Sequence, residues 1–229
     1  MITKKIQRKV YKALHPVVGE IWAFHRVVEQ RSEKAELRSL EVTPEWFDSM
    51  LLERQRKGCR FVSIDKLPSR GQWVCVTFDD GYHDTYALAR PILQRLGIPF
   101  TVYVATSFVD NRSEMWWYPG QSLALSTNEL CELARDPLCT LGAHTVSHVR
   151  LDQQDAQSQR NELLNSKREL ERLTGTPILH ASFPHGAYNE DTLRVCKELG
   201  FKTVTTSWGG PLRYGTHPWP LPRIDMRQP

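Results

Sequence analysis

The chain has 229 residues, and its 30 basic residues exceed its 26 acidic residues by only four. A net charge of +4 argues against a nucleic-acid-binding protein, whose binding face is strongly basic. No run of about 18 apolar residues offers a membrane-spanning helix, and no apolar stretch follows the basic N-terminus as in a secretory signal. Five scattered cysteines without a Cys-x-x-Cys pair favour reduced thiols. We therefore expect a cytoplasmic protein.

The first residues form a local exception to this mild charge. Apolar residues recur at every fourth position of residues 2–14, between basic residues that no acid offsets: Lys4, Lys5, Arg8, Lys9 and Lys12. The pattern predicts a basic helix over residues 1–18. Such a helix either rests on an anionic membrane, at its inner face, or packs on the domain. The second interpretation is favoured, because the stripe is short and has no Trp or Phe anchor.

Residues 19–229 alternate predicted strands with predicted helices. The expected strands cover residues 19–24, 61–64, 73–78, 100–105, 138–141, 178–183 and 202–206. The expected helices cover residues 43–57, 84–96, 127–135, 155–173 and 189–199, with Thr43-Pro44 as a helix start. Residues 28–41 are expected as a loop, and the proline-rich tail as extended chain. The alternation predicts a single-domain, distorted (β/α) barrel. An open doubly wound sheet is the alternative, although no Gly-x-Gly-x-x-Gly follows a strand.

Carboxylates and imidazoles follow two of these strands. Asp79 and Asp80 end the apolar run 73–78, and His144 and His148 follow the apolar segment 138–143. In a barrel the C-terminal ends of the strands meet at one face, where catalysis occurs. Two imidazoles and one carboxylate make a common site for a divalent metal, with zinc, cobalt, nickel or manganese as suitable ions. The second carboxylate would remain free as a base.

In combination these motifs resemble a known family. Thr-Phe-Asp-Asp-Gly at 77–81, His-Thr-x-x-His at 144–148 and Phe-Pro-His-Gly-Ala-Tyr at 183–188 resemble the polysaccharide deacetylases of the NodB-homology type, carbohydrate esterase family 4. The resemblance spans residues 19–225, and the triplet His25-Arg26-Val27 is similar to one found in the subgroup of exopolysaccharide and poly-N-acetylglucosamine deacetylases. It implies a distorted (β/α) barrel that removes the acetyl group from N-acetylated sugars with one divalent metal ion, and zinc is the ion that we expect first in this chain.

The resemblance also implies roles for individual residues. Asp79 matches the catalytic base, and three residues match the metal ligands: Asp80, His144 and His148. Thr145 matches a residue that supports the metal loop, and we also predict that it binds substrate. The turn of Pro184, His185 and Gly186 matches the substrate-binding motif whose backbone N–H helps to hold the oxyanion. His185 stands where the family usually has Tyr.

Two positions depart from the family pattern. The family often supplies its general acid from a late Leu-x-His motif, but this chain has Leu221-Pro222-Arg223. Ser182 also replaces the arginine that usually precedes the third motif. We predict that Arg223 takes over that arginine's work by orienting Asp79 and keeping it ionised. The acid is then expected from His25, with His217 as the second candidate. The alternative is that the His25 side chain supports the site through hydrogen bonds.

Three tryptophans are candidates for the substrate wall. Trp116 and Trp117 fall in the long loop after strand 100–105, on the expected catalytic face. Aromatic faces stack on sugar rings, so both are predicted substrate contacts. The alternative is that one of the two caps the barrel as core. Trp208 lies near a further family motif that lines the acetyl methyl group, but its local match is poor.

These inferences predict a metal-dependent hydrolase acting on an N-acetylated sugar in a surface-polysaccharide or glycolipid pathway. Two other classes stay open: a metal-dependent amidohydrolase acting on a non-sugar N-acyl or ring-amide compound, and a glycan-binding module without activity. The predicted partner is the sugar or glycan itself, with no nucleic acid.

Overall fold

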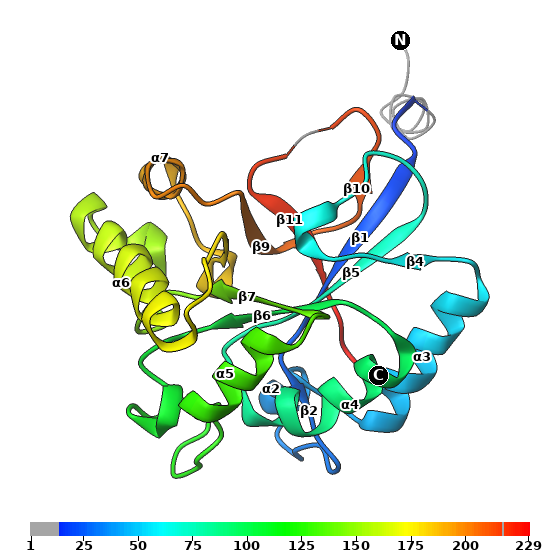
Figure 1. Ribbon diagram of the computed structural model, residues 1–229, viewed down its shortest axis with the longest axis horizontal. Coiled ribbons are helices and arrows are strands. Elements are labelled where there is room, and N and C mark those ends of the chain that lie inside the picture. Colours follow the sequence, from blue (N-terminus) through cyan, green and yellow to red (C-terminus); the bar gives the residue numbers. More distant parts are fainter. Residues whose placement is uncertain (1–13, 217) are drawn as a thin grey trace.

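Seven parallel strands close into a barrel. The computed structural model describes residues 14–216 and 218–229. Around the barrel the strands follow the order β1 (Val17–Phe24), β11 (Leu221–Asp225), β9 (Thr203–Gly209), β8 (His180–Ser182), β7 (Cys139–Ala143), β6 (Phe100–Val104) and β5 (Trp73–Phe78). The ring is closed because β1 pairs with both β5 and β11. The predicted barrel is therefore confirmed, and the open sheet is wrong (Figure 1).

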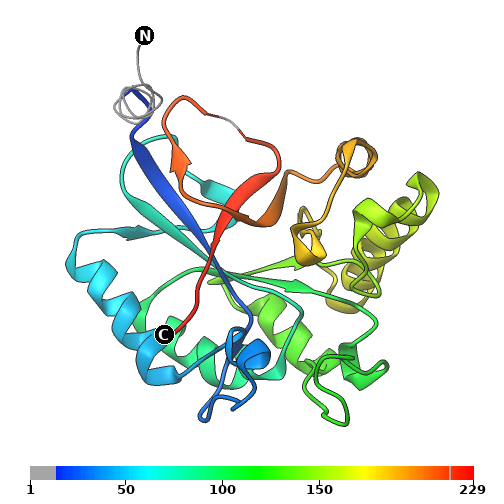
Figure 2. The ribbon, with the colours of Figure 1, turned by 180° about the vertical axis from the view of Figure 1, so that it is seen from behind.

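Short strands extend the barrel at its edges. β4 (Arg60–Phe61) pairs with β5, and β10 (Leu212–Arg213) pairs antiparallel with the beginning of β1. A separate parallel pair joins β2 (Arg26–Val27) to β3 (Glu41–Val42). Figure 2 shows β1, β9 and β11 on the side of the barrel toward the viewer. Among the described residues no helix connects β9 to β11, so this wall is made of strands alone.

Helices cover the other strands. They are α3 (Pro44–Arg56), α4 (Arg90–Leu96), α5 (Thr127–Arg135), α6 (Ala156–Thr174) and α7 (Glu190–Glu198), with the short α2 (Ala35–Arg38) near β3. Thr43 caps α3 by accepting a hydrogen bond from the Trp46 amide, with Pro44 in the first turn. Asp155 caps α6 in the same way, and α6 ends at Gly175, whose φ of 69° favours glycine.

The core lies between these helices and the strands. All six residues of β5 are buried, as expected for a parallel strand covered on both sides. Phe24, Phe47, Phe78 and Phe100 pack ring against ring, and Phe24 stacks on Phe78 at 5.5 Å between centroids. The aromatic packing anchors the strands whose last residues carry the functional groups.

Several expected boundaries are wrong. The expected loop 28–41 contains α2 and the beginning of β3, because Glu41 is buried and accepts a hydrogen bond from the Tyr118 hydroxyl at 2.8 Å. The expected strand 61–64 shortens to Arg60–Phe61, because Ser63 caps a 3-10 turn. The expected helix 84–96 begins with a π-turn, η2 (Thr85–Ala89), before α4. The expected extended tail contains β10 and β11.

The boundary of the N-terminal segment also differs from the prediction. Val17 and Val18 belong to β1 rather than to a helix ending at residue 18, because Val17 pairs with Arg213 of β10. The remaining calls on residues 1–13, and the candidate acid His217, lie outside the described residues. Within the described ranges no helix combines the length and apolarity needed to cross a bilayer.

Candidate active site

The end of β5 turns two carboxylates into one pocket. The Asp79 amide continues the strand pairing by donating to the Phe24 carbonyl at 2.9 Å. Asp80 then adopts a left-handed backbone with φ of 72°, and Gly81 follows with φ of 80°. A side chain at Gly81 would approach Val104 to 2.9 Å, so glycine lets this turn lie against β6. Both aspartates are consequently buried at the same edge of the barrel.

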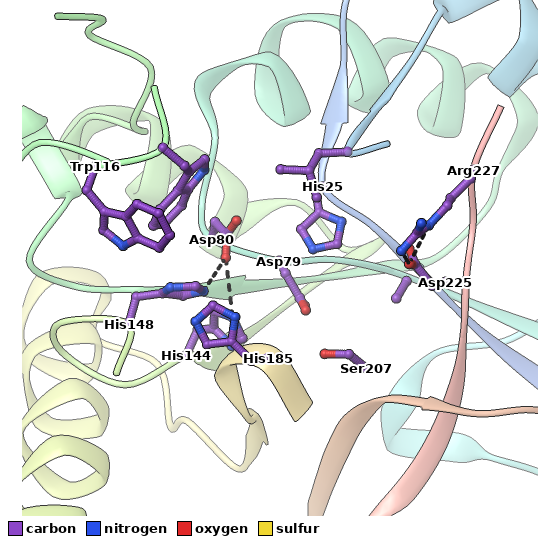
Figure 3. A pocket seen from close by; sticks show the side chains of 13 residues that line it. His25, Asp79, Asp80, Trp116, His144, His148, His185, Ser207, Asp225 and Arg227 are labelled. Carbon is purple, nitrogen blue, oxygen red and sulfur yellow. Dashed lines mark hydrogen bonds and ion pairs between the residues drawn. The ribbon is translucent and has the colours of Figure 1, made fainter. Parts of the chain in front are cut away.

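Asp80, His144 and His148 form a buried cluster with the donor atoms of a metal site. Oδ1 of Asp80 lies 3.3 Å from Nε2 of His144 and 3.1 Å from Nε2 of His148 (Figure 3). This buried oxygen has no well-formed hydrogen bond to a described residue, and all three ligand atoms lie within 4.8 Å of one another. Burial opposes ionisation of Asp80, but His148 and His144 hold its pKa well below the ordinary value. One carboxylate and two imidazoles facing one point fit a divalent cation.

The two imidazoles are supported differently. Nδ1 of His144 lies 2.8 Å from the Ser182 carbonyl and must donate to it, which leaves Nε2 free as a ligand. Nδ1 of His148 is buried without a hydrogen-bond partner among the described residues. The ring of His148 instead packs against the indole of Trp117, with 4.8 Å between centroids. Packing therefore orients one imidazole where a hydrogen bond orients the other.

Arg223 holds the second carboxylate, Asp79. The guanidinium is fully buried and makes a two-pronged contact, with Nη1 2.8 Å from Oδ1 and Nη2 2.5 Å from Oδ2 of Asp79. The contact that the sequence predicts between these residues is present. Arg223 also donates to three oxygens that fix its plane: Thr77 Oγ1, Ser182 Oγ and the Thr206 carbonyl. Burial alone would raise the pKa of Asp79, but the charge of Arg223 keeps it below the ordinary value.

A pocket of about 280 Å³ opens over these groups. Its wall contains all four residues Asp79, Asp80, His144 and His148, together with His25, His185 and the two indoles of Trp116 and Trp117. Figure 3 shows His25 on one side of Asp79 and Ser207 on the other. The structure thus brings the end of β1, the end of β5 and the loops after β6, β7 and β8 to one cavity.

The two neighbouring indoles occupy different positions. Trp116 is 69% exposed, so one face is free for a ligand. Trp117 is half-buried, donates from Nε1 to the Tyr82 hydroxyl at 2.6 Å and packs on His148. Trp117 therefore both lines the pocket and supports the ring of His148. Trp208 is 56% exposed but is not part of the pocket wall.

Three of the expected substrate-binding residues are buried and do not line the pocket. Thr145 is buried with φ of 65°, and its Oγ1 accepts a hydrogen bond from the His148 amide at 3.1 Å. Pro184 and Gly186 are also buried, and a side chain at Gly186 would come within 2.6 Å of Trp208. These positions favour a supporting role over direct contact. His185 does line the pocket, and burial, with help from His148, lowers its pKa to about 4.

The sequence prediction missed several residues of the site. Ser207, Asp225 and Arg227 line the pocket, and an ion pair joins the last two at 2.6 Å. Asp225 could have been found from its place at the end of a strand, but the tail was expected only as extended chain. Glu162 was missed as well. Its carboxylate accepts hydrogen bonds from the backbone between His144 and His148, and one acidic residue on a polar helix gives no signal in the sequence.

Residues 66–204 match the family described as polysaccharide deacetylase. The chain belongs to this family. The family includes a putative polysaccharide deacetylase of Bacillus subtilis, YxkH, to which the chain is 25% identical over 205 residues, covering 88% of the chain and 69% of the relative. The chain is also 23% identical to the poly-beta-1,6-N-acetyl-D-glucosamine N-deacetylase of Staphylococcus aureus, and the match covers 75% of the chain and 62% of that relative.

Solved structures agree with this membership in fold. The structure of IcaB from Ammonifex degensii superposes with a TM-score of 0.77 at 23% identity, covering 91% of each chain. The Streptococcus pyogenes deacetylase PplD, solved with acetate, gives a TM-score of 0.71 at 26% identity, covering 84% of this chain and 85% of that one. The polysaccharide deacetylase barrel is therefore kept over nearly the whole length of the chain.

Proposed function

We propose that this protein is a metal-dependent hydrolase that removes the N-acetyl group from an N-acetylated sugar. The observation that carries the proposal is the arrangement of Asp79 and Asp80. Asp80 faces the two Nε2 atoms of the histidines, while Asp79 is held apart from them by Arg223 in the same pocket. A pure binding site needs no ionised base beside a metal cluster, whereas hydrolysis of an amide needs both.

Asp80, His144 and His148 are the residues we assign to the metal. A divalent ion bound there would polarise the acetyl carbonyl and lower the pKa of a bound water. Zinc is the first choice for one oxygen and two imidazole nitrogens, and cobalt, nickel and manganese suit the same ligands.

Asp79 is the base in this mechanism. It accepts a proton from the attacking water, and Arg223 directs its carboxylate and keeps it ionised until that transfer. The backbone N–H of His185, whose residue lines the same pocket, is the donor we assign to the oxyanion. The side chain of His185 is uncharged at neutral pH because its pKa is lowered to about 4.

The general acid that protonates the leaving amine is assigned to His25. Its ring lines the pocket beside Asp79, directly after the end of β1 (Figure 3). An imidazole can carry a proton near neutral pH. Arg223 cannot serve as the acid, because a guanidinium keeps its protons. His217, outside the described residues, is the second candidate.

The substrate class rests on Trp116 and on the relatives. An exposed indole at the pocket mouth offers an apolar face on which a sugar ring can stack. One curated relative is named for poly-beta-1,6-N-acetyl-D-glucosamine and another, from Bacillus cereus, for peptidoglycan N-acetylglucosamine. We assign this chain to a surface-polysaccharide or glycolipid pathway. A non-sugar amide is the second candidate, and it would leave Trp116 without a role.

Acetate release from N-acetylglucosamine oligomers tests the proposal. Protein stripped of metal is assayed on β-1,4- and β-1,6-linked oligomers before and after zinc or cobalt is added back. We expect release only with metal, and a preference for one linkage would identify the glycan class. Stoichiometric metal binding without release from either oligomer would favour a non-sugar substrate or a glycan-binding module.

A further inference from the structure

The end of the barrel opposite the catalytic pocket holds a second, larger cavity. It measures about 560 Å³ and is lined by apolar side chains where strands begin, among them Trp73 of β5, Leu212 of β10 and Leu221 of β11. The catalytic carboxylates follow the other end of β5, so the two cavities lie at opposite ends of the strands. Figure 1 shows β10 and the beginning of β1 at the end where the described chain starts. We call this end the base of the barrel.

Two arginines that form no ion pair with a described residue line the cavity at the base. Arg70 and Arg213 line it, and no described residue forms an ion pair with either. Arg70 lies over the Tyr214 ring and donates to its hydroxyl at 2.8 Å, while Arg213 donates to the His15 carbonyl at 2.9 Å. No Asp or Glu lines this cavity or the adjoining one around Val17 and Gly71. A further cavity next to Trp73 contains Glu20, but that carboxylate is paired with Arg54 at 3.2 Å. Two ordered guanidinium groups therefore face solvent without a counter-charge.

Exposed apolar side chains surround the same end. Leu14 is 68% exposed, Val17 42% and Tyr214 38%. The described chain begins here with the segment that follows Lys4, Lys5, Arg8, Lys9 and Lys12, and no acid stands among residues 1–13. Apolar groups flanked by lysine and arginine are the pattern of surfaces that settle into the interface of an anionic bilayer.

We propose that the base of the barrel docks on an anionic membrane surface. Arg70 and Arg213 contact lipid phosphates, and Leu14, Val17 and Tyr214 enter the headgroup boundary. The catalytic pocket then opens away from the bilayer, by roughly 25 Å if the strands stand upright, since eight residues of β1 rise about 3.3 Å each. A glycan that extends from the surface fits this orientation.

Vesicle co-sedimentation of the full chain tests the docking surface. The vesicles contain phosphatidylcholine alone or mixed with phosphatidylglycerol. Each basic residue at such a surface contributes about fivefold in affinity, so an R70E/R213E variant is expected to bind anionic vesicles at least about 25-fold more weakly. The matched R70K/R213K variant keeps the charges and should bind within about twofold of the native chain.

A control variant and a second measurement on the native chain accompany this test. An R160E/R194E variant makes the same charge change on α6 and α7 and should still bind. Hydrogen exchange of the native chain should slow at residues 66–73 and 212–216 when anionic vesicles are added, which needs no variant to fold. Equal binding to both kinds of vesicle, no slowing at those residues, or undiminished binding of R70E/R213E would overturn the proposal.

A second inference concerns the loop that carries the histidine ligands, and it rests on the proposed metal site. Glu162 of α6 holds this loop with both carboxylate oxygens. Oε2 accepts hydrogen bonds from the amides of Val146 and Ser147 at 2.8 and 3.0 Å, and Oε1 accepts one from the Ser147 hydroxyl at 2.7 Å. The loop needs such support, because Thr145 and His148 adopt φ of 65° and 56°, which side chains disfavour.

We infer that Glu162 is a positioning residue for the metal. Replacement of its carboxylate by the isosteric amide should free the loop and weaken zinc binding by about 10- to 100-fold, as changes behind metal ligands do. Glu171 supplies a matched control on the same helix, since its Oε1 accepts from the Ile178 amide at 3.1 Å, on the segment that leads to β8. Zinc affinity is measured by competition with a chelating dye, independently of acetate release.

The expected result is a weaker zinc affinity in E162Q and an unchanged affinity in E171Q. Both variants should lose thermal stability to a similar degree in the metal-free state. S147A removes one of the three hydrogen bonds and should weaken zinc binding less, which keeps the test valid if E162Q does not fold. Native zinc affinity in folded E162Q would refute the inference while leaving the proposed reaction intact.

Discussion

At the scale of single residues, Asp79 and Arg223 decide what this pocket can do. A carboxylate buried beside a metal cluster would tend to become protonated or to join the ligands. The two-pronged contact with Arg223 opposes both outcomes, because it supplies a counter-charge and fixes the plane of Asp79. The contact therefore keeps Asp79 apart from the cluster of Asp80, His144 and His148 within one pocket.

Arg223→Lys should lower kcat for acetate release by about 10²-fold or more, because lysine keeps the charge but cannot form the two-pronged contact. Zinc affinity should change much less than kcat, since the polar partners of the two imidazoles are Ser182 and Asp80 rather than Asp79 or Arg223. Arg90→Lys, in the partly buried pair with Asp136 away from the pocket, is the control. Near-native kcat in Arg223→Lys would show that the orientation of Asp79 does not depend on its two-pronged contact with Arg223.

His25→Asn tests the assigned acid. The side chain is of similar shape but cannot carry a proton, so kcat should fall by about 10²-fold or more while zinc affinity is kept. The loss should be smaller for a substrate with a better leaving group, such as an acetylated aniline, because that amine needs less protonation. Unchanged turnover of the sugar substrate would remove His25 from the mechanism and favour His217.

At the scale of elements, the loop between β6 and α5 combines two functions in adjacent residues. Trp116 presents a free face at the pocket, whereas Trp117 is anchored by Tyr82 and packs on His148. The loop therefore links the exposed indole at the pocket to the imidazole of His148. The sequence predicted its place on the catalytic face but could not assign the two indoles, because the burial of Trp117 depends on Tyr82 and His148 from other segments.

Alanine at Trp116 should raise KM for an oligomer by about fivefold with little change in kcat, since stacking of about 1 kcal/mol is lost equally in ground and transition states. Tyr82→Phe removes only the hydroxyl that anchors Trp117 and should instead weaken zinc binding. Steady-state kinetics and zinc titration of both variants separate the two functions. A Trp116→Ala variant with native KM for every oligomer would place the sugar elsewhere.

At the scale of the whole molecule, the closed barrel is what makes short motifs into a site. Asp79, Asp80, His144 and His148 were predicted because each follows an apolar run, and parallel strands place such positions at one edge. Arg223 was predicted from a departure in a motif, and its contact is present. Glu162, Ser207, Asp225 and Arg227 were not, because their roles arise only when β11 joins β1 and α6 packs beside the loop after β7.

The fold itself was largely predictable, and its errors have local causes. Apolar runs bounded by glycine or proline marked the strands of the barrel. The segment 28–41 was expected as a loop because it is rich in charged residues. In the fold, one of these residues, Glu41, is instead buried and hydrogen-bonded to Tyr118. Strand ends moved by a few residues where a cap such as Ser63 diverted the chain.

The most direct test of the account is the Asp79→Asn variant, measured for zinc binding and acetate release on the same preparation. Asparagine keeps the shape of the side chain and leaves Asp80, His144 and His148 in place. We predict one zinc per chain in both proteins, and acetate release that falls by about 10²- to 10⁴-fold in the variant. Release at the native rate from the zinc-loaded variant would contradict the assignment of Asp79 as the base on which the proposed reaction depends.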